Sequence, residues 1–437
     1  MASIKWLAGV GCGVALWMTA VADAENPVVA DGGVCDGHVR IFGDTAYLYS
    51  SHDFSAESKN WDMRDWLVWS SPDLIHWTRK FALKPADTYV KPDLKRCFAT
   101  DGATRNGKYY LYFSEGQAST GVAQSDSPDG PYVDALKRPL VKSVKGFNAY
   151  DPTVYVDDDA NRTPYFIWGQ YTFRIAKLND DMISLAEPER KIDMVKWARK
   201  SDANFLHKKN GLYYLTSNYG HYGTSKDIYG PYTYVGRLTP FGKDDNVDHP
   251  TFFTWHGQDY FVGNDTWSIP NNYFRSLRMT YVHYKRDGGI VVDPVVYNSK
   301  LGVGQYDAAG GTIEAEWYFK IEGQAKKAER AAGGFGIENI GNNDAMYFPN
   351  VTNLAKQTKL SFRAAGVKGG RIEVREETPT GELLSTCVIP AGDGAGADQT
   401  YTAAFKSVKD KCNLCLVFRG EAGELFRVDS LVFSGDE

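Results

Sequence analysis

The sequence predicts an all-β protein, a five-bladed β-propeller followed by a β-sandwich (jelly-roll) module. Aromatic strands with period-two alternation recur roughly every 45–65 residues over the first two thirds of the chain, a spacing typical of propeller blades. Turns of Asn-Gly or Asp-rich sequence separate these strands. Beyond a glycine-rich stretch the strands become lighter in aromatic residues, as expected of a β-sandwich.

The first residues have the pattern of a secretion signal. Lys5 precedes an apolar run from Trp6 to Val21, and Ala22-Asp23-Ala24 has small residues where signal peptidase cuts. We therefore expect residues 1–24 to be a signal peptide and the protein to be secreted or periplasmic. The apolar run is short for a membrane span and no later run replaces it, so we expect no integral membrane segment.

The first repeat opens with a β-hairpin between Val34 and Asp53. Its apolar residues alternate on both sides of a Gly43-Asp44 turn. Asp36 stands just before the first strand, where a side chain can project from the strand end into a cavity. The repeat closes with the segment from Asp65 to Trp77.

Four further copies follow, and together they predict a propeller over residues 25–297. Five sheets arranged radially leave a central channel and only short exposed edges. A β-sandwich with insertions is the alternative architecture. Asp151 stands at the same place in its copy as Asp36 does in the first, so we expect acids to meet at the channel. The aromatic strands of the five copies contain Tyr47, Tyr110, Tyr165, Tyr214 and Tyr260.

Residues 298–311 are rich in glycine and lack aromatic strands, which is typical of a linker. Residues 312–437 have short alternating strands at regular spacing, so we expect a β-sandwich there.

Composition narrows the class of ligand. The chain has 27 Tyr and 11 Trp, which suits an all-β protein with sugar-like ligands, although core packing also uses such residues. The net charge is −5 without a long basic block, so nucleic acid is not an expected partner.

Five cysteines remain after the expected signal cleavage, and an odd number leaves at least one thiol free or paired between chains. Cys35 and Cys97 are candidates for one bridge near Asp36. Cys387, Cys412 and Cys415 allow at most one more, and a Cys-x-x-Cys pair without further ligands does not predict zinc.

Several motifs resemble glycoside hydrolase family 43 from about Asn26 to Val296. They are Asp36 after Asn26-Pro27, Tyr150-Asp151-Pro152, NGKYYLYF, SDSPDGPY, KNGLYYLTSN and a late His249. The tail resembles a carbohydrate-binding module of family 6 through IEAEWY, PTGELL, LVFRG and FRVDSLVF. The resemblance implies a five-bladed propeller, hydrolysis with inversion, and three central acids.

The resemblance assigns Asp36 as general base, Asp151 as pKa modulator and Asp202 as general acid. At the last position the family usually has Glu, and Asp is one methylene shorter. Inverting hydrolysis needs an ionised base and a protonated acid, so we expect donors around Asp36 and a dry site beside a negative charge for Asp202.

Three residues are expected to bind the substrate, two of them from the same resemblance. Phe98 stands where relatives have Trp and is expected to be a smaller stacking platform for the sugar. His249 is expected near the channel, where it hydrates or helps to hold an ion. The alternative role of His249 is that of a hydrogen-bonding residue in the core. Arg275, which is not part of the resemblance, is expected to contact a substrate hydroxyl or the modulator, with a solvated or structural role as the alternative.

The tail resembles the binding module in its ion site more than in its sugar site. Glu314, Glu316 and Asp429 match the module's structural calcium position, and oxygen ligands suit that ion. The loops 340–344 and 391–396 lack aromatic residues. We therefore expect a packing module with structural Ca²⁺ and weak or no affinity for glycans.

These residues together predict a secreted inverting exo-glycoside hydrolase that acts as a monomer on plant or microbial polysaccharide without a catalytic cofactor. The first candidates are α-L-arabinofuranosidase and β-xylosidase, followed by exo-β-galactanase and β-galactofuranosidase. A catalytically silent glycan-binding propeller is the alternative from another class. Fructan hydrolysis on a similar fold would require Arg-Asp-Pro where this chain has Tyr150-Asp151-Pro152.

Overall fold

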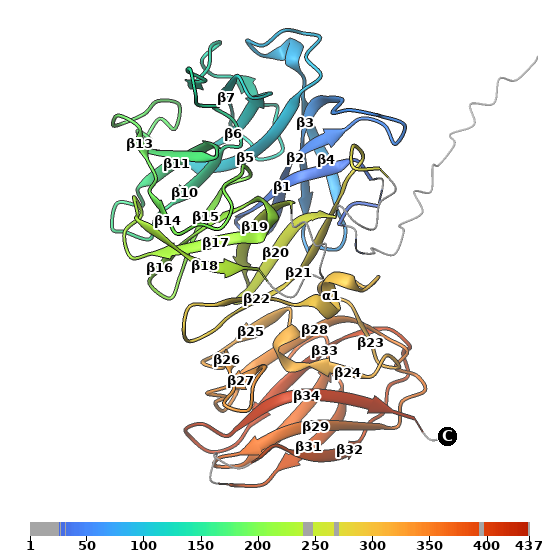
Figure 1. Ribbon diagram of the computed structural model, residues 1–437. Helices are drawn as coiled ribbons and strands as arrows, with labels where there is room; N and C mark the ends of the chain where they lie inside the picture. Colours follow the sequence, from blue (N-terminus) through green and yellow to red (C-terminus); the bar gives the residue numbers. More distant parts are fainter. Residues whose placement is uncertain are drawn as a thin grey trace, which may run out of the picture.

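The computed structural model describes residues 26, 28–30, 32–238, 248–265, 271–392 and 397–435. The predicted signal peptide, 1–24, lies outside them. Within these ranges the strands form seven sheets, five in a propeller and two in a β-sandwich that lies below it in Figure 1. The all-β prediction and its two-part architecture are therefore confirmed.

Each of the first three blades is an antiparallel sheet whose strands follow chain order, with a short extra edge strand in the second. The first has β1 (Val34–Phe42), β2 (Thr45–Asp53), β3 (Met63–Ser71) and β4 (Thr78–Leu83). The second has β5 (Cys97–Arg105), β6 (Lys108–Glu115), β7 (Ser119–Ser125), β8 (Val133–Asp134) and β9 (Val141–Lys142). The third has β10 (Thr153–Val156), β11 (Pro164–Gln170), β12 (Thr172–Lys177) and β13 (Arg190–Lys191).

The fourth blade takes its outermost strand from the chain that precedes its innermost one, and this strand pairs in parallel. Its strands are β14 (Met194–Val195), β15 (Phe205–Lys209), β16 (Leu212–Ser217), β17 (His221–Ser225) and β18 (Tyr232–Arg237). The fifth blade has β19 (Asp248–Trp255), β20 (Gln258–Asp265), β21 (Ser276–Tyr284) and β22 (Ile290–Val292), followed by the short helix α1 (Pro294–Asn298).

The innermost strands close a ring around the channel. β1 packs against β5 and β19, β5 against β10, β10 against β15, and β15 against β19. The hairpins behind them form where the sequence has Asn-Gly, because both residues adopt the left-handed backbone that a tight hairpin turn requires. Asn106 and Gly107 have φ of 52° and 75°, and Asn210 and Gly211 have 49° and 78°.

The sandwich consists of two sheets around one apolar core. The first sheet contains β23 (Tyr306–Asp307), β25 (Lys320–Glu322), β28 (Ala345–Thr352), β30 (Gly370–Glu376), β31 (Leu383–Ile389) and β33 (Cys412–Arg419). The second contains β24 (Thr312–Glu314), β26 (Lys326–Glu329), β27 (Phe335–Glu338), β29 (Lys359–Gly366), β32 (Gln399–Ala404) and β34 (Phe426–Ser434).

The two domains are joined by a bonded interface, with α1 at their boundary (Figure 1). Gln258 of the propeller donates through Nε2 to the carbonyls of Glu316 (2.8 Å) and Tyr318 (2.7 Å). Trp317 donates through Nε1 to Asp293 Oδ2 at 2.7 Å and packs against the core between the first and fifth blades. The segment predicted as a linker takes part, since the hydroxyl of Tyr306 donates to the Trp317 carbonyl and Tyr306 lies in the sandwich core.

The five cysteines that the structure describes are free, which corrects the candidate bridges. Cys35, Cys97, Cys387, Cys412 and Cys415 are all buried thiols. The Cys35 sulfur instead accepts a hydrogen bond from Arg275 at 3.1 Å. Burial raises the pKa of each of the five thiols, which disfavours the reactive thiolate.

In the described part of the chain, no helix has the length and apolar character to cross a membrane.

Candidate active site

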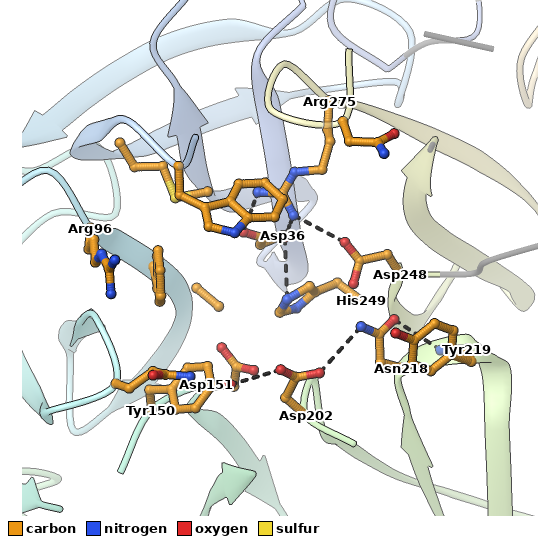
Figure 2. A pocket seen from close by; sticks show the side chains of 16 residues that line it. Asp36, Arg96, Tyr150, Asp151, Asp202, Asn218, Tyr219, Asp248, His249 and Arg275 are labelled. Carbon is orange, nitrogen blue, oxygen red and sulfur yellow. Dashed lines mark hydrogen bonds and ion pairs between the residues drawn. The ribbon is translucent and has the colours of Figure 1, made fainter. Parts of the chain in front are cut away.

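A cavity of about 570 Å³ opens where the innermost strands begin, at one end of the channel (Figure 2). It brings together every residue that sequence predicts for catalysis and substrate binding: Asp36, Phe98, Asp151, Asp202, His249 and Arg275. Ten further residues complete its lining: Trp61, Met63, Arg96, Ala99, Gln117, Tyr150, Asn218, Tyr219, Asp248 and Asn272.

The backbone turns into the channel in the same way at four blades. Asp36, Asp151, Ala203 and His249 have φ between 49° and 54°, a left-handed conformation that is uncommon outside glycine. Such residues cluster at functional sites, where the surrounding structure stabilises them. Asp36 and Asp151 thus occupy equivalent positions, whereas Asp202 lies one residue earlier, in register with Asp248.

Asp36 is a buried carboxylate surrounded by donors. Its Oδ1 accepts from Asn264 Nδ2 and from Arg275 Nη1, each at 2.7 Å, and its Oδ2 accepts from Arg275 Nη2 at 3.1 Å. Burial alone would raise the pKa of Asp36, but the charges of Arg275 and His249 hold it well below the ordinary value. Asp36 is therefore ionised at neutral pH, as a general base requires.

Arg275 is the cation that fixes this side of the pocket. Besides Asp36 it binds Asp53 through Nε (3.0 Å) and Asp248 through Nη1 (3.0 Å), and it is only 4% exposed. The Trp61 ring lies 4.4 Å from its guanidinium carbon. Of the two contacts expected for Arg275, the one with Asp151 is not formed among the described contacts, because the guanidinium is committed to the Asp36 side.

Asp151 lies on the facing side of the pocket and has few donors. Its Oδ2 accepts from the backbone N–H of Ala203 at 2.8 Å, and no described side chain donates to it. Burial raises the pKa of Asp151 to about 8, with the charge of Asp202 adding to the shift and that of His249 opposing it. Asp151 is the carboxyl group of the pocket that most favours a proton.

Asp202 receives four side-chain hydrogen bonds. Its Oδ2 accepts from Tyr150 Oη (2.8 Å) and Gln170 Nε2 (3.0 Å). Its Oδ1 accepts from Ser201 Oγ (2.9 Å) and Asn218 Nδ2 (3.3 Å). Burial would raise the pKa of Asp202, but the Tyr150 hydrogen bond and the His249 charge lower it instead. This direction is opposite to our expectation of a protonated Asp202, because the shorter side chain meets donors rather than a dry wall.

His249 lies between the two sides of the pocket (Figure 2), with Nε2 3.3 Å from Asp36 Oδ1. Burial would lower its pKa, but Asp36, Asp248 and Asp151 raise it. In the described residues, Asp36, Asp248 and His249 alone form a group whose ligand atoms all lie within 4.8 Å of one another. Arg275 already donates to both carboxylates, and its positive charge between them would repel a cation, so this set does not fit a metal ion.

The walls contain the predicted Phe98 and further aromatic residues that sequence reasoning did not select. Phe98 is half-buried and stands 6.2 Å from the Tyr150 ring. Trp61 is 38% exposed and meets Tyr273 edge-to-face at 4.8 Å. Tyr219 completes the opposite wall with a left-handed φ of 65°. An aromatic residue in a loop between two hairpin strands is the weak signal that could have identified Trp61.

Asp151 and Asp202 face Asp36 across the pocket, with the cationic Arg275 and His249 between them. Such an arrangement can deprotonate water on one side and protonate a leaving oxygen on the other. Residues 24–225 match the family described as glycosyl hydrolases family 43, and residues 314–435 match carbohydrate binding module family 6. Residues 24–225 are therefore a glycosyl hydrolase family 43 catalytic domain, followed by a family 6 carbohydrate-binding module.

Relatives of this family 43 enzyme share about a quarter of its sequence. Xylosidase/arabinosidase 43A of Humicola insolens is 29% identical over 61% of this chain and 98% of its own length. Arabinoxylan arabinofuranohydrolase of Paenibacillus polymyxa is 28% identical over 92% of this chain and 72% of its own. The family 43 enzyme of Xanthomonas citri in complex with xylose is 27% identical over 61% of this chain and 92% of its own, with a TM-score of 0.53.

The predicted calcium ligands of the family 6 module differ in their surroundings. The Glu316 Oε2 atom is buried and has no hydrogen-bond partner in the described structure. Burial raises the pKa of Glu316 to about 8, and the neighbouring Glu314 adds to the shift. Asp429 instead pairs with Arg330 and with Arg363 Nε (3.3 Å). Glu316 thus has an unpartnered oxygen, beside the carboxyl group of Glu314, that suits a hard cation, whereas Asp429 is already paired with arginines.

Proposed function

We propose that this family 43 enzyme is a secreted exo-glycosidase that inverts configuration and acts on arabinoxylan-type polysaccharide, as an α-L-arabinofuranosidase or β-xylosidase. The observation that carries the proposal is the pairing of an ionised Asp36 on one side of the pocket with the proton-favouring Asp151, beside Asp202, on the other. The activities by which the similar proteins are named support the substrate class. An extracellular relative and the signal-like residues 1–24 support secretion.

In this mechanism the sugar stacks against Phe98 and the Asp36 carboxylate removes a proton from the attacking water. Arg275 and Asn264 keep Asp36 ionised and oriented. The Asp151–Asp202 side of the pocket carries one proton in the active form, and Asp202 delivers it to the leaving oxygen. The proton that Asp36 takes from the water then returns through solvent to reset both sides for the next turnover. Inversion requires the two catalytic carboxyl groups to be roughly 6.5–9.5 Å apart, which leaves room for the water.

We also propose a structural Ca²⁺ in the family 6 module, held by Glu314 and Glu316, with Asp429 joining if Arg330 moves away. Such an ion would supply positive charge to the orphaned Glu316 oxygen. It stabilises the folded module and takes no part in hydrolysis.

A panel of nitrophenyl glycosides tests the function. We expect turnover of the α-L-arabinofuranoside or β-D-xyloside, with the inverted anomer as the first product seen by proton NMR. Turnover of only the β-galactoside or β-galactofuranoside would instead indicate an exo-β-galactanase or a β-galactofuranosidase. Absence of turnover on every member, with retained binding of xylo-oligosaccharides, would favour a silent glycan-binding propeller, which the four donors on Asp202 make the second candidate.

A further inference from the structure

The wall of the pocket carries a guanidinium that hydrolysis of a neutral sugar does not use. Arg96 lines the cavity, and its side chain is exposed. In the described part of the structure the Arg96 guanidinium has no hydrogen bond or ion pair. Other arginines near the pocket are paired, Arg275 with Asp36 and Arg64 with Asp62. Hydroxyl groups of a neutral sugar could be bound here by the neighbouring amides of Gln117 and Asn272.

The position of Arg96 is fixed by its backbone and by the stem of its side chain. Its carbonyl accepts from the N–H of Gly116 at 2.8 Å, and a parallel bridge joins it to Met63. A Cβ at Gly116 would lie 3.4 Å from the Arg96 Cβ and 3.7 Å from its Cδ, so the stem packs against this glycine. The guanidinium therefore stands beside the pocket two residues before Phe98 (Figure 2).

A second guanidinium stands by the opposite wall. The Arg199 guanidinium carbon lies 3.4 Å from the centroid of the Tyr219 ring, and Tyr219 lines the pocket opposite Arg96 in Figure 2. Arg199 and the adjacent Lys200 are exposed. Cations therefore flank the mouth on two sides.

The floor of the pocket has the opposite character. Asp36, Asp151, Asp202 and Asp248 are gathered there, with Arg275 and His249 as counter-charges. A carboxylate on the reacting sugar would be repelled by these acids, whereas one on the next sugar would lie by the cations. A guanidinium is well suited to it, because its planar donors match a carboxylate in a bidentate geometry.

We propose that Arg96 forms a subsite for the carboxylate of a uronic acid on the leaving-group side of the scissile bond, while Arg199, by the opposite wall, adds positive potential without contacting it. The inference rests on the proposed glycosidase function and narrows its substrates to acidic, uronic-acid-bearing glycans.

The test compares two forms of one oligosaccharide. The first is an arabinofuranosyl-substituted xylo-oligosaccharide with one glucuronic acid, and the second is the same compound with its carboxyl group reduced to the alcohol. The ratio of kcat/KM for the acidic and neutral forms is measured for the wild type, Arg96→Met, Arg96→Lys and Lys95→Met. Lys95→Met removes an adjacent positive charge that does not line the pocket and serves as the matched control.

We expect the wild type to prefer the acidic form, with Arg96→Met lowering the ratio about 10- to 100-fold, the range of a charge-assisted hydrogen bond. Arg96→Lys should recover part of the preference, Lys95→Met should retain it, and added salt should reduce it. Equal rates on both forms in the wild type, or the same ratio in Arg96→Met and Lys95→Met, would overturn the proposal.

Calorimetry separates this proposal from the proposed function. Titration of the full-length Asp36→Asn protein with each form measures the preference without turnover. If the wild type hydrolyses neither form nor any nitrophenyl glycoside, the function fails, while tighter binding of the acidic form would still support the subsite. Equal binding of both forms by a protein that is active on nitrophenyl glycosides would refute the subsite alone.

Discussion

Asp202 is assigned as the proton donor, yet its four hydrogen bonds favour the ionised carboxylate and lower its pKa. Its replacement by Asn is therefore the most informative perturbation. An Asn keeps the size of Asp202 but has one acceptor oxygen for the four donors of Tyr150, Gln170, Ser201 and Asn218. Two of these donors lose their acceptor, and each costs about 1–3 kcal/mol where it stays unsatisfied. We therefore expect a lower melting temperature for Asp202→Asn, with the fold retained.

The activity of the Asp202→Asn variant should depend on the leaving group. General acid catalysis contributes about 10²–10⁴ in rate, so hydrolysis of an oligosaccharide or alkyl glycoside should fall by that factor. A dinitrophenyl glycoside needs little protonation, and its rate should fall by less than about tenfold. The assay is kcat/KM on both substrate classes for the wild type, Asp202→Asn and Asp151→Asn.

The matched variant distinguishes the two acids of the pair. If Asp202 is the donor and Asp151 keeps the proton on that side of the pocket, Asp151→Asn should also slow poor leaving groups more than good ones. The reasoning is refuted if Asp202→Asn leaves both classes unchanged while Asp151→Asn slows only the poor leaving groups. Asp151, whose pKa is raised to about 8, would then be the proton donor.

Three further predictions follow from the same contacts. Asp36→Asn should lower kcat by about 10²–10⁴ with oligosaccharide binding retained in calorimetry, and a variant with more than about a tenth of wild-type activity would contradict its role as base. On the acidic side, kcat/KM should stay level down to acidic pH, because the pKa of Asp36 is depressed. On the alkaline side, kcat/KM should fall as the pH rises through about 8, where Asp151 loses its proton. An alkaline limb that already falls at pH 6 would count against the assignment of Asp151. Removal of the chain after Gly304 should lower the melting temperature more than the rate on nitrophenyl glycosides, because it breaks the hydrogen bonds of Gln258 and Asp293 to the sandwich. Chelation of Ca²⁺ should lower the melting temperature of the full-length protein by mass action. An unchanged melting temperature after truncation would show that the interface is not stabilising, and one after chelation would show the same of the ion.

The sequence by itself determined the blades and the first two acids. Period-two alternation and Asn-Gly turns are local signals, so they identified the hairpins from Asn106 and Asn210 without knowledge of the rest of the chain. Asp36 and Asp151 were recognisable because each stands near the start of the innermost strand of its repeat. Asp36 lies in the irregular first residues of β1, inside the strand that it was expected to precede, and Asp151 lies two residues before β10.

Only the tertiary structure decided what surrounds those acids. Asp36 receives its donors from Asn264 and Arg275, which are 228 and 239 residues away in sequence, because closure of the ring places the fifth blade beside the first. The offset of Asp202 by one residue from the left-handed position likewise depends on the backbone of Ala203, and it turns the carboxylate toward four donors. Sequence identifies which residue types stand at a strand end, whereas the charge state of each depends on neighbours that only the closed propeller brings together.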